Sequence, residues 1–376
     1  MNGLYKDREQ TEAKHEILRR YLESFAHKVG RTYETIDYVD AFCGPWEERD
    51  SKDLSDTSIA IALGKLQSVA ETLDTNGRKR IRCIFNEKTA KSFAKLQAYV
   101  EANRGKFPLL EIHTLHGTFE NNAGKIKELA THKFMLLFVD PTGWSGFSPD
   151  ALGTLIGQRN SEVIINFMRS FIVRHLCPPG PEQMDRLTDL LGEKRAKRLA
   201  GQHLPITKIE EELFEVLKDD LGFRFAAKSP IHNPDKDQVH FHLFYGTHHP
   251  AGMQVMRDAE YKALSQHDRN RFEKKEDQYQ FSLFGEDLEV QGPYLQARQE
   301  HASGLAGAIL KRLQTSSPSL KFATLRAEMQ ETHYLKEAEI KDVVVELADA
   351  GKIEPTWKLR KGRRPKDDDC IYLKRR

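Results

Sequence analysis

The alternation of apolar and polar positions divides the N-terminal part of the chain into helices and strands. Apolar residues at helical spacing open it over 12–29, and short apolar runs then alternate with amphipathic stretches. Because alternating strands and helices build βαβ units, the pattern predicts an α/β, doubly wound Rossmann-like sheet that is mostly parallel. We expect strands at 35–42, 80–87, 109–116, 133–140 and 161–167, and helices at 56–66, 88–103, 118–130 and 148–157.

The pattern changes after a helical region at about 181–221. The runs "GFRFAAKSP" and "QVHFHLFYGT" predict two successive strands joined by a turn at "NPDK". Residues 262–293 are polar and poorly periodic, which we interpret as a linker or peripheral excursion. Helical patterns then precede a basic β-hairpin, as in a winged-helix-like module. The expected domains are therefore a Rossmann-like domain over 1–261, the segment 262–293 and a C-terminal domain over 294–376.

Composition sets the broad class of the protein. The 376 residues are 39% hydrophobic and 30% charged, which is typical of a soluble globular chain. No stretch of eighteen apolar residues occurs and the first residues lack the apolar core of a signal peptide, so we expect no membrane segment. The four cysteines have no paired spacing, which favours the reducing cytoplasm and predicts neither a disulfide nor a zinc framework.

The candidate chemistry lies where the predicted strands end, because ligands of open parallel sheets bind there. The first strand ends at Asp40, the second at Glu87 and the fourth at Asp140. Neither the G-x-G-x-x-G fingerprint nor a phosphate loop is present, so a pyrophosphate ligand is not expected. An acid at the end of the second strand can bind a ribose diol. S-adenosylmethionine, which has a ribose, a positive centre and no phosphates, fits this arrangement, and a late antiparallel strand is typical of class I methyltransferases.

Four segments together resemble the three-Cys-motif partner family, over roughly residues 10–260. They are "KHEILRRYL" (14–22), "YVDAFCGPW" (38–46), "LFVDPTGW" (137–144) and "HHPAGMQVM" (248–256). That family is similar in turn to the ribosomal RNA adenine-N6 methyltransferases. The resemblance implies a Rossmann-like fold that binds S-adenosylmethionine, and a protein partner with a three-cysteine motif that holds an iron–sulfur cluster.

The resemblance also implies roles for individual residues. Asp140 and the Pro141 carbonyl would orient the substrate amine, with Thr142 and Trp144 in the same motif. Two positions depart from the family pattern: Trp46 replaces a glycine, and the aromatic residue of "DPTGW" stands one position late. The residues implied to bind the cofactor are Lys14, His15, Asp40, Phe42, Gly44, Glu87, Lys88, Gly117, Thr118, Phe119 and Asp140.

Each candidate has a plainer interpretation that the sequence leaves open. Asp40 and Glu87 could cap helices, and Asp140-Pro141 could initiate a turn. Cys43 is more typical of a small buried residue than of a nucleophile. Lys14 and His15 could lie on a solvated helix face. The histidines 240, 242, 248 and 249 could begin a zinc site, but no third ligand at a telling distance follows and we expect no metal.

The C-terminus carries a separate candidate, the nucleic-acid interface. Six basic residues fall within 358–366 beside Trp357, which could pack the wing or stack on a base. The run is either a solvated loop or a wing that follows a phosphate backbone. Its basic residues are Lys358, Arg360, Lys361, Arg363, Arg364 and Lys366.

The hypothesis is a cytoplasmic S-adenosylmethionine-dependent methyltransferase acting on a nitrogen of nucleic acid, with adenine N6 as the expected atom. A first alternative is a methyltransferase-like binding protein, possibly inactive because of Trp46, that acts as partner or regulator of the iron–sulfur protein on nucleic acid. A second alternative is a nucleoside-binding enzyme of another reaction class.

Overall fold

The structure, a computed structural model, divides the chain into two compact units. One comprises 1–226 and 230–248, and the other 227–229 and 249–376. None of the helices in the described parts is long and apolar enough to cross a membrane. The residues described are 5–6, 8–44, 50, 54–73, 79–130, 133–141, 146–156, 160–169, 172, 181–199, 205–279, 292–315, 319–359 and 363–374.

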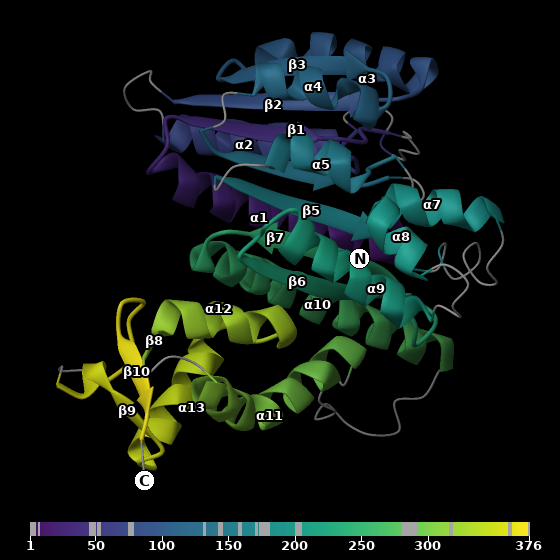
Figure 1. The fold of residues 1–376 in the computed structure, drawn as a ribbon. Helices are drawn as coiled ribbons and strands as arrows, with labels where there is room; N and C mark the ends of the chain where they lie inside the picture. Colours follow the sequence, from purple (N-terminus) through teal and green to yellow (C-terminus); the bar gives the residue numbers. More distant parts are fainter. Residues whose placement is uncertain are drawn as a thin grey trace. The chain divides into compact units, whose positions relative to one another are not determined.

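The first unit is built on a seven-stranded sheet in the order β3-β2-β1-β4-β5-β7-β6 (Figure 1). The first five strands pair in parallel, and β7 pairs antiparallel with β5. This confirms the predicted Rossmann-like fold class with its late antiparallel strand. The strands are β1 (Thr35–Asp40), β2 (Arg80–Glu87), β3 (Leu110–His116), β4 (Met135–Val139), β5 (Ser161–Phe167), β6 (Phe225–His232) and β7 (Val239–Thr247).

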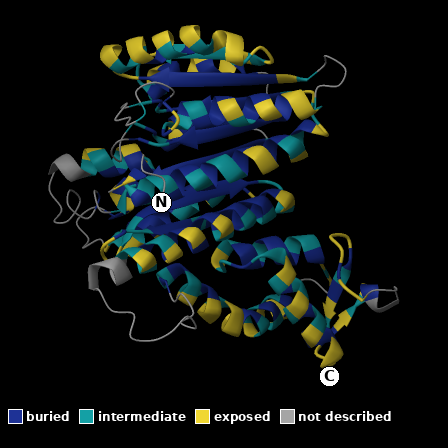
Figure 2. Ribbon diagram, turned by 180° about the vertical axis from the view of Figure 1, so that it is seen from behind, coloured by how far each residue is buried: buried dark blue, intermediate teal, exposed yellow. Residues whose placement is uncertain are grey.

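Helices cover both faces of this sheet, and the strands between them are buried (Figure 2). Val39, Leu137 and Val163 point to one face, where they share a core with α4, α5 and α7–α9. The opposite face carries α1 and α2, which contact each other. The helices are α1 (Glu9–Gly30), α2 (Ser58–Leu73), α3 (Ala90–Asn103), α4 (Phe119–Leu129), α5 (Pro149–Ile156), α7 (Pro181–Leu191), α8 (Glu193–Leu199) and α9 (Ile206–Glu215).

A buried polar cluster ties α1 to the amino end of β5. Glu162 is almost fully buried and accepts hydrogen bonds from the hydroxyls of Tyr21 and Thr247. The Tyr21 hydroxyl also lies 2.8 Å from that of Tyr245. Burial raises the pKa of Glu162, and the hydrogen bonds from the hydroxyls oppose that shift. The cluster is stable because each buried polar group has a partner.

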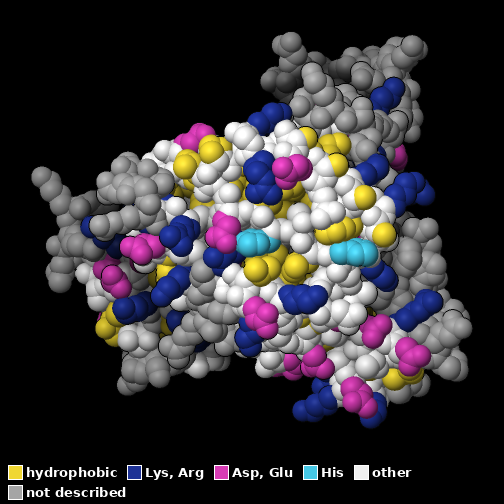
Figure 3. Space-filling model, turned by 90° about the horizontal axis from the view of Figure 1, so that it is seen from above, with side chains coloured by type: hydrophobic (Ala, Val, Ile, Leu, Met, Phe, Trp, Pro, Cys, Tyr) yellow, Lys and Arg dark blue, Asp and Glu magenta, His cyan; other side chains and the backbone are white. Residues whose placement is uncertain are grey.

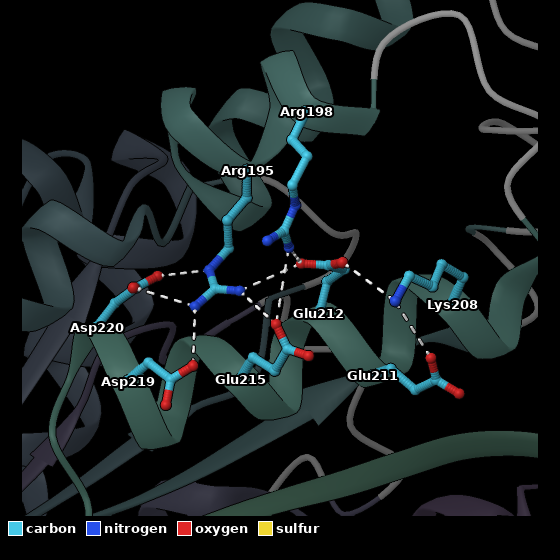
Figure 4. Close-up of polar contacts among 8 residues, drawn as sticks. All are labelled: Arg195, Arg198, Lys208, Glu211, Glu212, Glu215, Asp219 and Asp220. Atoms are coloured by element: carbon cyan, nitrogen blue, oxygen red, sulfur yellow. Dashed lines mark hydrogen bonds and ion pairs between the residues drawn. The ribbon is translucent and has the colours of Figure 1, made fainter.

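An ion cluster at the other edge of the unit holds α8 against α9 and the π-helical turn η3 (Val216–Asp220). Arg195 lies at its centre, with its Nε 2.7 Å from Asp220 and its Nη1 2.7 Å from Glu215 (Figure 4). Hydrogen bonds to Asp220, Glu215 and Glu212 raise the pKa of this guanidinium, against the effect of burial. The cluster therefore adds ion pairs to the apolar packing that these three short elements share in the core.

In its described residues, the second unit has four α-helices and a three-stranded antiparallel sheet in the order β8-β10-β9. Trp357 is buried in its core with Phe322 and Ile371, so of the two interpretations of Trp357 the packing role holds. Its elements are α10 (Pro250–Tyr279), α11 (Pro293–Thr315), β8 (Leu320–Lys321), α12 (Phe322–Thr332), α13 (Glu337–Asp349), β9 (Ile353–Pro355), the 3-10 turn η4 (Thr356–Leu359) and β10 (Cys370–Leu373).

The interpretation of 262–293 as a linker is wrong for its first part, because α10 continues to Tyr279. The buried face of this part of the helix is polar, with Ser265, His267 and Asp268 all buried. Asp268 accepts a hydrogen bond from the Leu295 backbone at the start of α11. Apolar periodicity cannot reveal a helix whose buried face is polar. Residues 280–291 lie outside the described residues.

We expect Tyr21→Phe to lower the free energy of unfolding by about 1–3 kcal/mol, because it leaves the buried Glu162 carboxyl short of one donor. Tyr33→Phe is the matched control: its hydroxyl donates to Asn160 over 3.2 Å at a half-buried site. That loss should cost only about 0.5 kcal/mol. Urea unfolding of both variants measures the difference, and equal losses would contradict the role assigned to the cluster.

Candidate functional site

A cavity of about 350 Å³ opens at the carboxyl ends of β1, β4 and β5. The strand order reverses between β1 and β4, so the cavity lies at the topological switch point where open α/β sheets bind ligands. Of the predicted site residues, six line it: Lys14, His15, Phe42, Gly44, Asp140 and Pro141.

Strand alternation explains why polar side chains meet here. Val39, Val139 and Ile165 face the apolar core, so the residues that follow them point to the face that carries α1. Val139 pairs with Ile165 in the register of β4 and β5. The next residues along the two strands are Asp140 and Asn166, and both line the cavity.

Asp140 is held from two sides. Its Oδ2 lies 2.5 Å from Nζ of Lys14 on α1, and its Oδ1 accepts a hydrogen bond of 2.6 Å from Nδ2 of Asn166. The side chains of Lys14 and Asp140 are only 10% and 17% exposed. Lys14 is therefore not on a solvated helix face. The ion pair positions the carboxylate at the cavity wall, where its remaining lone pairs can accept further hydrogen bonds.

Asp40 lies beneath the cavity and does not line it. Its Oδ2 accepts a 2.8 Å hydrogen bond from the Ser58 hydroxyl at the start of α2, and its Oδ1 accepts one from the Phe42 backbone. Burial raises the pKa of Asp40 to about 7; the two hydrogen bonds oppose the shift and the nearby Asp140 adds to it. Asp40 thus links the end of β1 to the first residue of α2, and its assignment to the cofactor stays a prediction.

Glu87 likewise has a local role. Its Oε1 accepts hydrogen bonds from both the backbone (2.7 Å) and the hydroxyl (2.9 Å) of Thr89, which precedes α3. Thr118 caps α4 in a similar way, accepting from the Asn121 backbone. Glu87, Lys88, Gly117, Thr118 and Phe119 are not among the residues that line the cavity. Their assignment to the cofactor stays a prediction.

Asn86 ties the ends of three strands together, and the sequence argument gave it no role. Its Nδ2 donates to the carbonyls of Ala41 and Gly117, each over 3.1 Å. Its Oδ1 accepts from Nδ2 of Asn122, over 2.8 Å. Gly117 has a φ of +134°, and a Cβ there would lie 3.1 Å from Asn122 Nδ2, so this position requires glycine.

Burial shifts the pKa of two side chains at the cavity, His15 and Cys43. The His15 ring lies 3.0 Å from the Tyr5 hydroxyl through Nδ1, and burial lowers its pKa well below the usual value, so the ring is neutral. Burial raises the pKa of the Cys43 thiol well above its usual value, with Asp40 adding to the shift. Cys43 is therefore protonated and acts as a small buried side chain.

The remaining candidates are separate from this cavity or cannot be placed. His242 is buried and its Nδ1 lies 3.0 Å from Glu210. Within the part of the chain that the structure describes, no group of three or more His, Cys, Asp or Glu could hold a metal ion. Thr142, Trp144 and Trp46 lie outside the described residues.

Asn166, Arg8 and Asp56 are among the cavity residues that the sequence did not single out. Asn166 lies near the end of the apolar run "SEVIINF", in which a single amide draws little notice. The sequence nevertheless carried a signal. The strands β4 and β5 are adjacent and parallel, and Asn166 points to the same face of the sheet as Asp140. Reading the polar positions of neighbouring strands together would have selected both residues.

Comparisons with known proteins return distant structures only. No protein-family model and no curated protein matches the chain. An O-methyltransferase from Bacillus cereus in complex with SAH is 11% identical over 61% of this chain and 80% of that chain, with a TM-score of 0.33. The O-methyltransferase TomG from Streptomyces achromogenes, involved in tomaymycin synthesis and in complex with SAM, is 12% identical over 65% and 92%, with a TM-score of 0.34. The fold assignment rests on the strand order and pairing.

The raised pKa of Asp40 predicts a pH dependence of stability. The native state binds the proton more tightly than the unfolded state, whose value is 3.8, so stability falls as pH rises from about 4 to about 7. Asp40→Asn can keep both hydrogen bonds and cannot ionise. We expect the variant to gain stability relative to wild type across this window, by up to about 4 kcal/mol. Unfolding free energies at pH 4 to 8 test this; a constant difference would contradict it.

Proposed function

We propose that the protein is a class I methyltransferase that uses S-adenosylmethionine, with the cofactor and the methyl acceptor meeting at the cavity. The observation that carries the proposal is the corner formed by Lys14, Asp140 and Asn166 at the switch point of the sheet. The resemblance in the segments around residues 14–22, 38–46 and 137–144 supports it independently, because these segments supply residues to that cavity.

The side chains that line the cavity fit a cofactor that carries both positively and negatively charged groups. The cavity contains the Lys14–Asp140 pair, and a second pair in which Arg8 Nη2 lies 2.6 Å from Asp56. These groups can meet the ammonium and carboxylate of an amino-acid tail. When bound, the cofactor supplies a methyl group on a positively charged sulfur.

The protein's own part in the reaction is positioning. Asp140 would accept a hydrogen bond from the group to be methylated, and the Pro141 carbonyl would accept a second one. These hydrogen bonds would hold the lone pair of that group toward the methyl group. Lys14 and Asn166 keep Asp140 in place through hydrogen bonds. Orientation of this kind accounts for a large share of rate enhancement in reactions that need little acid–base chemistry. Two neighbouring oxygens that accept hydrogen bonds suit an amine nitrogen as the atom to be methylated. The candidate is N6 of adenine in nucleic acid.

The first test is calorimetric titration with S-adenosylmethionine and S-adenosylhomocysteine, followed by methyl transfer to RNA, DNA and small amine and hydroxyl acceptors. We expect Asp140→Ala to lower transfer by about 100-fold, because the acceptor group loses its orientation. Cofactor affinity should fall far less. Asp140→Asn, which keeps an oxygen at the same place, should retain more activity. Transfer by Asp140→Ala at the wild-type rate would exclude the proposed role.

We further propose that the second unit contacts nucleic acid through the basic loop at 358–366. Its order of elements, α11-β8-α12-α13-β9-β10, is similar to that of a winged helix, and the basic run falls between β9 and β10 in the sequence. Arg363, Arg364 and Lys366 are exposed, whereas Lys358, Arg360 and Lys361 have side chains outside the description. The iron–sulfur protein implied by the resemblance remains a proposed partner.

The distribution of charge favours the basic loop over the helix α13 as the site of contact with nucleic acid. The helix α13 carries Glu337, Glu339, Asp342, Glu346 and Asp349 against one lysine, so it would repel a phosphate backbone. On the described residues of the face in Figure 3, basic and acidic side chains are interspersed, and they form no extended basic surface there. The basic loop is therefore the stronger electrostatic candidate.

An ion pair within this unit gives the sharper test. Arg364 pairs with Asp342 of α13, at the surface. Asp342→Asn should release Arg364 and strengthen duplex binding, with a steeper dependence on salt. Arg363→Ala/Arg364→Ala should weaken binding to many sequences alike and reduce the salt slope by about one unit per lost contact. Fluorescence anisotropy over a salt series measures both, and identical slopes for all three proteins would exclude the loop.

A further inference from the structure

Asn166 carries an unused hydrogen-bond acceptor at the cavity. The residue is 2% exposed, and its Oδ1 is buried with no hydrogen-bond partner among the residues that the structure describes. A buried polar atom without a partner destabilises the fold, so it calls for a ligand or a functional reason.

The orientation of this amide is fixed by its neighbour. Asp140 Oδ1 lies 2.6 Å from Asn166 Nδ2, and a carboxylate can only accept. Turning the amide over would bring two acceptor oxygens together. The nitrogen therefore faces Asp140, and the free oxygen is the atom left for another group.

We propose that Asn166 Oδ1 accepts a hydrogen bond from an N–H group of the bound ligand, making Asn166 a positioning residue beside Asp140. This rests on the proposed function. This N–H group has two candidate sources: the α-ammonium of the cofactor and the amino group of the methyl acceptor. With Asp140 adjacent, the two side chains form a pair of acceptors that selects an amino group over a carbonyl or an ether at the same place.

Two substitutions test this role. Asn166→Leu loses both the donor to Asp140 and the free acceptor. Asn166→Asp keeps an oxygen acceptor, and because two carboxyls 2.6 Å apart share a proton, it also keeps a donor to Asp140. Thr247→Val is the control for stability, because Thr247 is a buried residue that donates to Glu162 in the separate polar cluster at the amino end of β5. Thermal unfolding of all three shows which variants fold.

The probes are chosen in two pairs, one for each source of the amino group. S-adenosylhomocysteine is compared with 5′-methylthioadenosine, which lacks the amino-acid tail. Adenosine is compared with purine riboside, which lacks only the 6-amino group, in the presence of saturating S-adenosylhomocysteine. Calorimetry gives the affinity ratio of each pair for each protein.

We expect Asn166→Leu to reduce one of the two ratios by about tenfold, the effect of one hydrogen bond, and Asn166→Asp and Thr247→Val to keep it. A change in the first ratio identifies the cofactor's ammonium, and a change in the second identifies the acceptor's amino group. Unchanged ratios in Asn166→Leu, or equal losses in Asn166→Leu and Asn166→Asp, overturn the assignment while leaving methyl transfer standing. Failure of the wild type to bind S-adenosylhomocysteine overturns both proposals.

Discussion

The pairing of Asp140 is the interaction on which the architecture of the cavity depends. A carboxylate with so little exposure is tolerated only when donors replace the water that it has lost. Lys14 supplies one from α1 and Asn166 supplies the other from β5. Removing either partner would leave a poorly solvated charge, at a cost of several kcal/mol. The same two contacts join the first helix to the middle of the sheet. The geometry of the site and the packing of α1 on the sheet therefore depend on the same contacts.

Much of the fold could be predicted from the chain because its strands are continuous apolar runs. The expected strands 80–87 and 161–167 coincide with β2 and β5. The C-terminal half of α10 was not predictable in this way, since its buried residues include Ser265, His267 and Asp268, and Asp268 accepts a hydrogen bond from the Leu295 backbone. Apolar periodicity indicates which hydrophobic residues are buried, but it does not indicate which polar residues are buried.

The candidate site was predictable as a location and less so in its details. Lys14 and Asp140 were selected as separate motifs, yet their contact joins residues 126 positions apart and no local pattern encodes it. Asp40 and Glu87 were selected for a ligand and prove to hold Ser58 and Thr89. An acid at a strand end serves the turn first, because the backbone there always needs an acceptor. Binding of a ligand by such an acid is an additional role, which local sequence cannot distinguish.

The charges at this corner also constrain the ligand. Lys14 pairs with Asp140 and Arg8 with Asp56, so the cavity wall is close to neutral. Asp40 does not line the cavity; both its oxygens accept hydrogen bonds from neutral groups, and burial raises its pKa to about 7. A permanent cation in the cavity would stabilise the ionised form of Asp40 and lower its pKa, whereas a neutral ligand would not. For the proposed cofactor, this means that the sulfonium form is favoured over the neutral thioether left after transfer.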